Sequence, residues 1–138
     1  MLDGVKVFIK NKSTGKFLFH LRDNDPNIPN PNKWSLFGGG IEKDESPEEA
    51  LKREVLEEIG IEIDSISLIE TIPITQKVKE KEFPIKIYLF KAETKNNQIT
   101  KLTEGKEAAW FNIDEILEKD LVPNLKLLLE KHSGVLEE

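Results

Sequence analysis

A run of three glycines followed by a helix with marked ends is the feature that most constrains this chain. Residues 38–40 are all glycine, and residues 47–59 carry the signals of one helix. Ser46 and Glu49 form a capping box at its beginning, with a proline at the first helical position. Gly60 supplies the left-handed residue that ends a helix. The sequence therefore predicts a backbone that bends sharply at the glycines and then enters a short helix.

Two stripes of side chains run along this predicted helix. An apolar residue recurs every four positions, which predicts a buried face made of Leu51, Val55 and Ile59. The neighbouring stripe carries carboxylates at positions i, i+3 and i+4, which are Glu54, Glu57 and Glu58. Like charges at this spacing repel one another, so a site that gathers them needs a cation. Oxygen ligands of this kind suit Mg²⁺ or Mn²⁺, and a solvated acidic surface is the alternative interpretation.

Charged residues and glycines keep a fixed spacing from Gly39 to Ile61. The pattern is G-x5-E-x7-R-E-U-x-E-E-x-G-U, where U is a bulky aliphatic residue. This segment resembles the Nudix box and matches it completely. The resemblance implies a Nudix hydrolase, an enzyme that cuts a diphosphate linked to some other group X. It also implies a single Nudix hydrolase domain over residues 1–138 with an α/β fold, a Nudix-type α/β/α sandwich with a mixed central sheet.

The resemblance further implies roles for the charged residues of this segment. The implied metal site consists of backbone and side-chain oxygens, contributed by Gly38, Glu54, Glu57 and Glu58. Arg53 is implied to hold this ligand set in place by pairing with a carboxylate, and Glu45 is its natural partner. Mg²⁺ is the expected cofactor, with Mn²⁺ as the alternative.

Glutamates in two places compete for the role of general base, because family members differ in this respect. The candidate inside the box is Glu54. The distal candidates are Glu104 and Glu107, which lie six and three residues before Trp110. The spacing of Glu104 resembles that of the distal ligand in MutT-type members, so Glu104 is favoured as a catalytic and metal-binding residue. Glu107 is the alternative distal carboxylate.

Two residues outside the box are candidates for binding the substrate. Arg22 follows the second predicted strand and can reach a phosphate, with an ordinary surface arginine as the alternative. Asn124 follows a proline, and in MutT-type enzymes an asparagine near this place reads the edge of an oxidised guanine. The competing interpretation of Asn124 is a helix cap or a turn residue. Phe37 stands where many family members have proline, which can alter the loop beside the box.

The expected reaction is that of a MutT-like nucleoside triphosphate pyrophosphohydrolase, which releases a monophosphate and pyrophosphate. Nudix enzymes that act on ADP-ribose usually carry extra N-terminal strands, for which 138 residues leave little room. ADP-ribose, dinucleoside polyphosphates and nucleotide sugars stay open as substrates. The alternative of another class is a non-catalytic Nudix module that binds nucleotides. Such modules typically lose box carboxylates, whereas this chain has all of them.

Composition limits the partners of this chain. A net charge of −6 repels nucleic-acid backbones, so no nucleic-acid polymer is expected as a partner. The resemblance implies that the partner is a nucleotide or another small diphosphate compound. We expect no membrane span, because no run of about 18 apolar residues is present, and no signal peptide. The chain has no cysteine, so disulfides and thiolate sites are absent. A cytoplasmic location is expected, and the oligomeric state is left open.

The rest of the chain predicts strands on both sides of the helix. Strand patterns cover residues 5–9, 16–21, 61–74, 83–91 and 108–111, and a final helix covers about 123–132. A loop is predicted at 23–32, a turn at 95–98 and a helical turn at 114–117. This order predicts a sheet between helices. His20 and His132 have no partner at a motif spacing and receive no role.

Overall fold

The structure, a computed structural model, describes residues 2–95, 99–103 and 105–138. Strands and helices follow one another with these bounds: β1 (Gly4–Asn11), β2 (Phe17–Leu21), β3 (Trp34–Ser35), β4 (Phe37–Gly40), α1 (Pro47–Ile59), β5 (Asp64–Val78), β6 (Lys81–Thr94), β7 (Glu107–Phe111), α2 (Ile113–Leu117) and α3 (Leu125–Leu136). Each strand and helix expected from the sequence is present.

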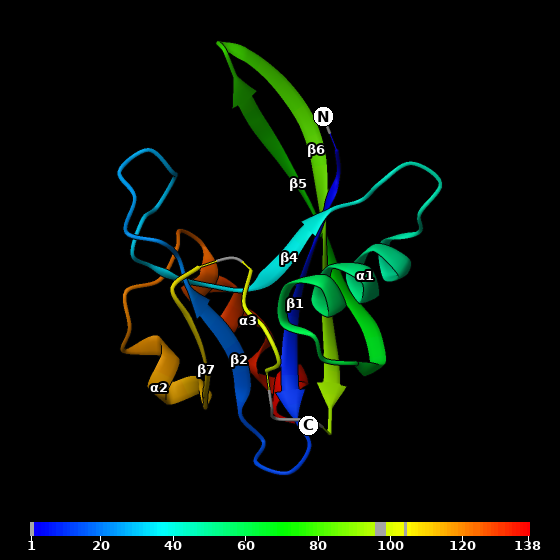
Figure 1. Cartoon of the computed structure of the whole chain (residues 1–138), viewed down its shortest axis with the longest axis vertical. Coiled ribbons are helices and arrows are strands. Elements are labelled where there is room, and N and C mark those ends of the chain that lie inside the picture. Colours follow the sequence, from blue (N-terminus) through cyan, green and yellow to red (C-terminus); the bar gives the residue numbers. More distant parts are fainter. Residues whose placement is uncertain (1, 96–98, 104) are drawn as a thin grey trace.

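β1 lies at the centre of one mixed sheet of seven strands (Figure 1). It runs parallel to β6 and antiparallel to β2 and β4. β2 also pairs with β3 and β7, and β5 pairs with β6. The predicted α/β class with a mixed sheet is therefore confirmed.

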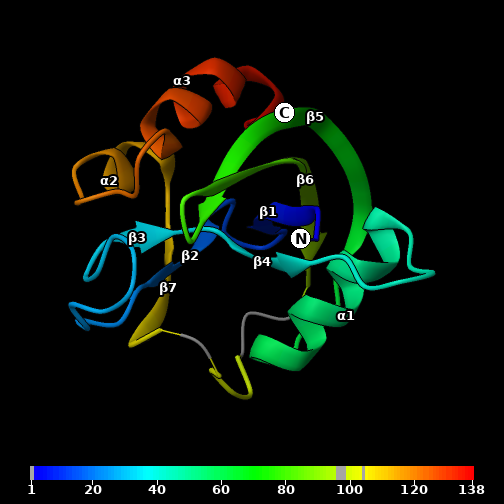
Figure 2. The ribbon, with the colours of Figure 1, turned by 90° about the horizontal axis from the view of Figure 1, so that it is seen from above.

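Two apolar cores lie on opposite faces of this sheet, because side chains alternate along each strand. On one face, Val5, Val7 and Ile9 of β1 pack with the buried stripe of α1. On the other face, Phe8 of β1 packs with residues of α2 and α3. Figure 2 shows α1 on one side of the sheet and both other helices on the opposite side. This α/β/α arrangement sets α1 beside β1 and β4.

The hairpin of β5 and β6 is longer than the sequence predicts. The predicted strands end at residue 74 and begin again at residue 83, whereas the observed strands meet at a two-residue turn made by Lys79 and Glu80. Both turn residues have positive φ, 50° and 67°, as a tight antiparallel hairpin requires. Residues 75–82 are exposed, so their sequence needs no apolar alternation. Figure 1 shows this arm extending beyond the body of the protein.

Two smaller differences concern the second half of the chain. The predicted turn at 95–98 falls largely on residues 96–98, which lie outside the described residues. The last helix begins at Leu125 instead of residue 123 and continues to Leu136, past the predicted end at residue 132. Within the described ranges, no helix has the length and apolar character needed to cross a membrane.

Candidate functional site

α1 is fixed at both ends by the cap signals in its sequence. The hydroxyl of Ser46 accepts a hydrogen bond from the backbone N–H of Glu49 at 3.1 Å, and the Glu49 carboxylate accepts one from the N–H of Ser46 at 3.0 Å. The bond from the Ser46 backbone holds the pKa of the Glu49 carboxyl below its usual value. Gly60 ends the helix with a φ of 71° and donates to the carbonyl of Leu56 at 3.0 Å. The predicted bounds of α1 are confirmed.

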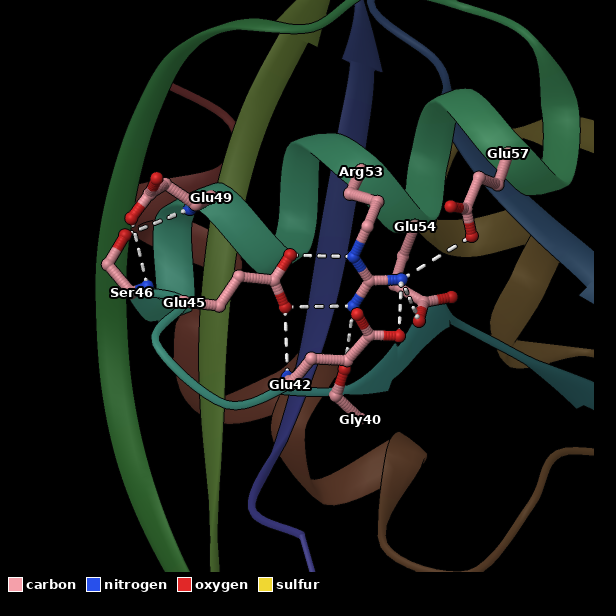
Figure 3. A network of polar contacts seen from close by, with 8 residues as sticks. All are labelled: Gly40, Glu42, Glu45, Ser46, Glu49, Arg53, Glu54 and Glu57. Atoms are coloured by element: carbon pink, nitrogen blue, oxygen red, sulfur yellow. Dashed lines mark hydrogen bonds and ion pairs between the residues drawn. The ribbon is translucent and has the colours of Figure 1, made fainter.

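Arg53 connects α1 to the loop that precedes it, as Figure 3 shows. Its Nε donates to Glu45 Oε2 at 2.6 Å, and its Nη2 donates to Glu45 Oε1 at 2.9 Å. Nη2 also donates to the carbonyl of Gly40 at 3.0 Å. The guanidinium, helped by the N–H of Glu42, lowers the pKa of the Glu45 carboxyl to about 2. The expected pairing of Arg53 with Glu45 is therefore present, in a two-bond geometry that lysine cannot reproduce.

The remaining nitrogen of Arg53, Nη1, faces the carboxylates of α1. It donates to Glu54 Oε1 at 2.9 Å and to Glu57 Oε2 at 3.4 Å. The Glu54 side chain is 17% exposed and that of Glu57 is 62% exposed, whereas Glu58 is buried. Bonding to Glu45 and Glu54 raises the pKa of Arg53 above its already high value. The structure thus brings Glu54 and Glu57 together around one positive charge.

The oxygen atoms of the box residues are of the kind that bind a divalent cation. Carboxylate and carbonyl oxygens are the ligands that Mg²⁺ prefers. Gly39 leaves room for the Glu54 carboxylate, because an added Cβ there would overlap its oxygens. Across the described ranges, no three acidic or histidine side chains already converge around one point. Glu54 and Glu57 point instead to Arg53, so a cation would have to draw them away from Nη1.

Of the two distal glutamates, only Glu107 lies among the described residues. Glu107 opens β7 and pairs with Leu21 of β2. Ala108 and Trp110 pack on the α1 side of the sheet, and Ala109 packs on the opposite side. Since side chains alternate along a strand, Glu107 shares the face of Ala109 and points away from α1. Glu104 lies outside the described residues.

The chain just before residue 104 is attached to the end of α1. The backbone N–H of Thr103 donates to the carbonyl of Glu58 at 3.1 Å, and that of Thr100 donates to the carbonyl of Ile59 at 3.1 Å. On the other side of residue 104, the N–H of Lys106 donates to the carbonyl of Leu21 at 2.8 Å. The loop that connects to β7 is therefore held to both α1 and β2.

The two predicted substrate residues lie apart from this network. Arg22 is half-buried and donates from Nε to the carbonyl of Pro29 at 3.0 Å, so it braces the loop after β2. Asn124 precedes α3 with a φ of 73° and makes no side-chain capping hydrogen bond. Its exposed side chain leaves the substrate interpretation open.

The sequence assigns no role to the two histidines, and the structure shows which residues each of them contacts. His20 is buried, its ring lies 4.5 Å from the ring of Phe37, and its Nε2 lies 3.1 Å from the carbonyl oxygen of Leu36. Nε2 of His132 lies 2.7 Å from Oε2 of Glu70 and so ties α3 to β5. No spacing rule finds this second pair, because its members are 62 positions apart.

The chain is similar to named proteins along most of its length. The family model described as NUDIX domain matches residues 2–131. The oxidized purine nucleoside triphosphate hydrolase of Mus musculus is 31% identical over 103 residues, which cover 72% of this chain and 64% of that protein. The match to the Danio rerio protein of the same name covers 52% of its length. The nucleoside triphosphatase NudI of Escherichia coli is 32% identical over 101 residues, covering 66% of this chain and 70% of that protein.

Solved structures agree with this assignment. The mutator MutT protein from Bacillus halodurans has a TM-score of 0.77 at 25% identity, covering 100% of this chain and 84% of that one. The MutT protein from Methanosarcina mazei Go1 has a TM-score of 0.74 at 24% identity, covering 99% of this chain and 96% of that one, and so shares the fold. Because the family model covers nearly the whole sequence and the box network is in place, the chain belongs to the Nudix family.

Proposed function

We propose that this protein is a Mg²⁺-dependent hydrolase of nucleoside triphosphates that releases a nucleoside monophosphate and pyrophosphate. The observation that carries the proposal is the position of Arg53, which holds two box glutamates beside the backbone of Gly40. The mouse and Escherichia coli relatives are named for hydrolysis of nucleoside triphosphates, which supports this substrate class.

Some residues of the box hold the site in shape, and others bind the cation or take part in the reaction. Arg53 is a positioning residue, because its bonds to Glu45 and Gly40 fix the loop against the helix. Glu54, Glu57 and Glu58, with the carbonyl of Gly38, would hold the cation. A bound divalent ion supplies charge neutralisation of phosphate oxygens and activation of water for in-line attack. Glu54 Oε1 is bonded to Arg53, so Oε2 is the oxygen of Glu54 that we expect to accept a proton.

We assign the distal carboxylate to Glu104 in preference to Glu107, since Glu107 points to the face of the sheet that is opposite α1. The test compares Glu104→Gln with Glu107→Gln at saturating Mg²⁺. Loss of a general base collapses turnover and removes the acidic limb of the pH–rate profile. We expect this in Glu104→Gln if the base is distal, and in Glu54→Gln if the base lies in the box. Such a result in Glu107→Gln alone would transfer the distal role to that residue.

The experiment that tests the overall proposal is a substrate panel scored by product. The purified protein is incubated with nucleoside triphosphates, ADP-ribose, a dinucleoside polyphosphate and a nucleotide sugar, with Mg²⁺, with Mn²⁺ and with a chelator. We expect pyrophosphate and monophosphate from triphosphates only when a divalent ion is present. Preferred cleavage of another diphosphate compound would correct the substrate. Binding of nucleotides with no metal-dependent cleavage of any compound would indicate a non-catalytic module.

A further inference from the structure

His20 is a buried, polar residue that the proposed reaction does not use. It belongs to β2, where it pairs with Ser35 of β3 and with Ala108 of β7. Leu18 lies two positions earlier in the strand and packs on the α1 side of the sheet, so the ring of His20 lies on that side too. The residue is only 1% exposed. An imidazole in such a place is costly unless its polar atoms have partners, so its contacts indicate what it does.

One edge of the His20 ring holds the chain just before the three glycines. Nε2 lies 3.1 Å from the carbonyl oxygen of Leu36, which stands between the end of β3 and the beginning of β4. Because a carbonyl oxygen only accepts, Nε2 carries the hydrogen and donates it. The ring of Phe37, the first residue of β4, lies 4.5 Å from the ring of His20. His20 therefore fixes the point from which β4 continues to Gly38, whose carbonyl is a proposed metal ligand.

The ring also lies against the chain that leads into β7. A Cβ added to Gly105 would lie 2.9 Å from Nδ1 of His20 and 2.6 Å from the carbonyl oxygen of Leu21. Gly105 has a φ of 85°, a left-handed conformation that favours glycine. The next residue, Lys106, donates its N–H to the carbonyl of Leu21 at 2.8 Å. Gly105 is therefore packed so closely against the ring that a side chain at this position would collide with it.

From these contacts we infer that His20 is a positioning residue, which holds the segment at Gly105 at a fixed place relative to the beginning of β4. Its ring contacts both segments, so a displacement of one is transmitted to the other. Gly105 directly follows Glu104, to which we assign the distal carboxylate, and β4 leads to the box side of the proposed metal site. This inference rests on the proposed function for the role of Glu104. It adds a residue outside the box that aligns the two sides of the site.

The first test separates kcat from KM. His20→Phe keeps an aromatic ring but loses the N–H donor. We expect it to lower kcat by about 10- to 100-fold and to change KM for a nucleoside triphosphate by less than about threefold, since a displacement of about 1 Å at a reacting group costs about 100-fold in rate. His20→Gln keeps a donor at a similar place along the side chain and should recover part of this loss.

The matched control for this test is Phe19→Leu, which alters a buried side chain on the opposite face of the same strand. It should lower Tm, because it removes buried apolar volume, and it should keep kcat. If Phe19→Leu loses as much kcat as His20→Phe at a similar Tm, the loss reflects general destabilisation and the role of His20 is overturned.

A double-mutant cycle tests whether His20 acts through Glu104. When His20→Phe is added to Glu104→Gln, kcat should fall by no more than about twofold further, because the group that His20 positions is already lost. Effects that multiply would show that His20 acts elsewhere, and the inference would fail. If Glu104→Gln alone has wild-type turnover, the distal assignment is wrong, and the exchange measurement below decides whether His20 holds the segment.

Hydrogen exchange of backbone amides tests the contact without catalysis. In His20→Phe the N–H of Lys106 should exchange on the order of tenfold faster, whereas the N–H of Ala50, bonded to Ser46 in α1, should keep its rate. Gly105→Ala disturbs the same contact from the other side, so it should give the same result even if His20→Phe does not fold. Faster exchange at Lys106 in a protein that cleaves no triphosphate would support the contact and refute the proposed function. Unchanged exchange at Lys106 in both variants would overturn the inference and leave the proposed function intact.

Discussion

The same substitution, glycine to alanine, should damage the protein in different ways at Gly38 and Gly39. At Gly39 the new Cβ would overlap the carboxylate of Glu54, which is the far end of a flexible side chain. At Gly38 it would overlap the backbone carbonyl of Val5 on the neighbouring strand. A side chain can rotate away from such a contact, whereas a paired strand has to move as a whole.

The expected losses of stability and of rate depend on how far each overlapping contact can relax. In Gly39→Ala the Glu54 side chain leaves its rotamer and loses its bond to Arg53, which costs about 1 kcal/mol of stability. A displacement of about 1 Å at a reacting group costs about 100-fold in rate. In Gly38→Ala the pairing of β1 and β4 is disrupted, and forced overpacking of this kind costs about 3 kcal/mol or more. In a chain of this length these values correspond to losses of about 3 °C and about 10 °C in Tm.

The assay combines thermal unfolding with the rate of pyrophosphate release at saturating Mg²⁺. Gly134→Ala in α3 is the control, since an added Cβ there meets no atom within 4 Å and alanine favours the helix by up to about 1 kcal/mol. We expect Gly39→Ala to melt close to the wild type and to turn over poorly. The reasoning is refuted if Gly39→Ala loses as much stability as Gly38→Ala, or if it keeps wild-type turnover.

Three further predictions concern the charged network. Glu57→Gln and Glu58→Gln should each weaken Mg²⁺ binding and lower turnover by orders of magnitude. Without metal, the Tm of each variant should equal or exceed that of the wild type, because one of several like charges is removed. If a variant keeps near-normal activity at limiting Mg²⁺, the replaced glutamate is not an essential ligand. Arg53→Lys should restore only part of the activity lost in Arg53→Ala, since lysine cannot make both bonds to Glu45; full activity would mean that charge alone matters. The folded-state pKa of Glu45 is about 2, below its ordinary 4.5, so its stabilising effect is complete above pH 4.5 and is lost as the pH falls towards 2. Urea unfolding of the wild type and Glu45→Gln should therefore converge over this range, and a constant difference down to pH 2.5 would contradict the assignment.

Local signals in the sequence were sufficient to predict α1 and its charged face. The capping residues and Gly60 are adjacent to the helix they limit, so its bounds need no tertiary information. The pair of Arg53 and Glu45 is likewise confined to one motif of the chain. These features carry the family assignment, because they do not depend on how distant strands pair.

Features that depend on distant pairing could not be read from the sequence. The face of Glu107 follows from the register of β7 on β2, which joins residues about 90 positions apart. The parallel pairing of β1 with β6 joins strands that lie on either side of α1 in the chain. The exposed end of the β5–β6 hairpin lacks apolar alternation, because both of its faces are in contact with water.

The nitrogens of the Arg53 guanidinium make two sets of contacts that have different effects. Nε and Nη2 bind Glu45 and Gly40, which lie outside α1, and these bonds fix the loop whether or not a cation is present. Nη1 binds Glu54 and Glu57, which are proposed cation ligands, and it neutralises part of their repulsion. The acidic face can therefore fold without a metal ion. A divalent ion that binds the same two carboxylates has to replace only the contacts of Nη1, so the loop can stay in place while the ligands change partner.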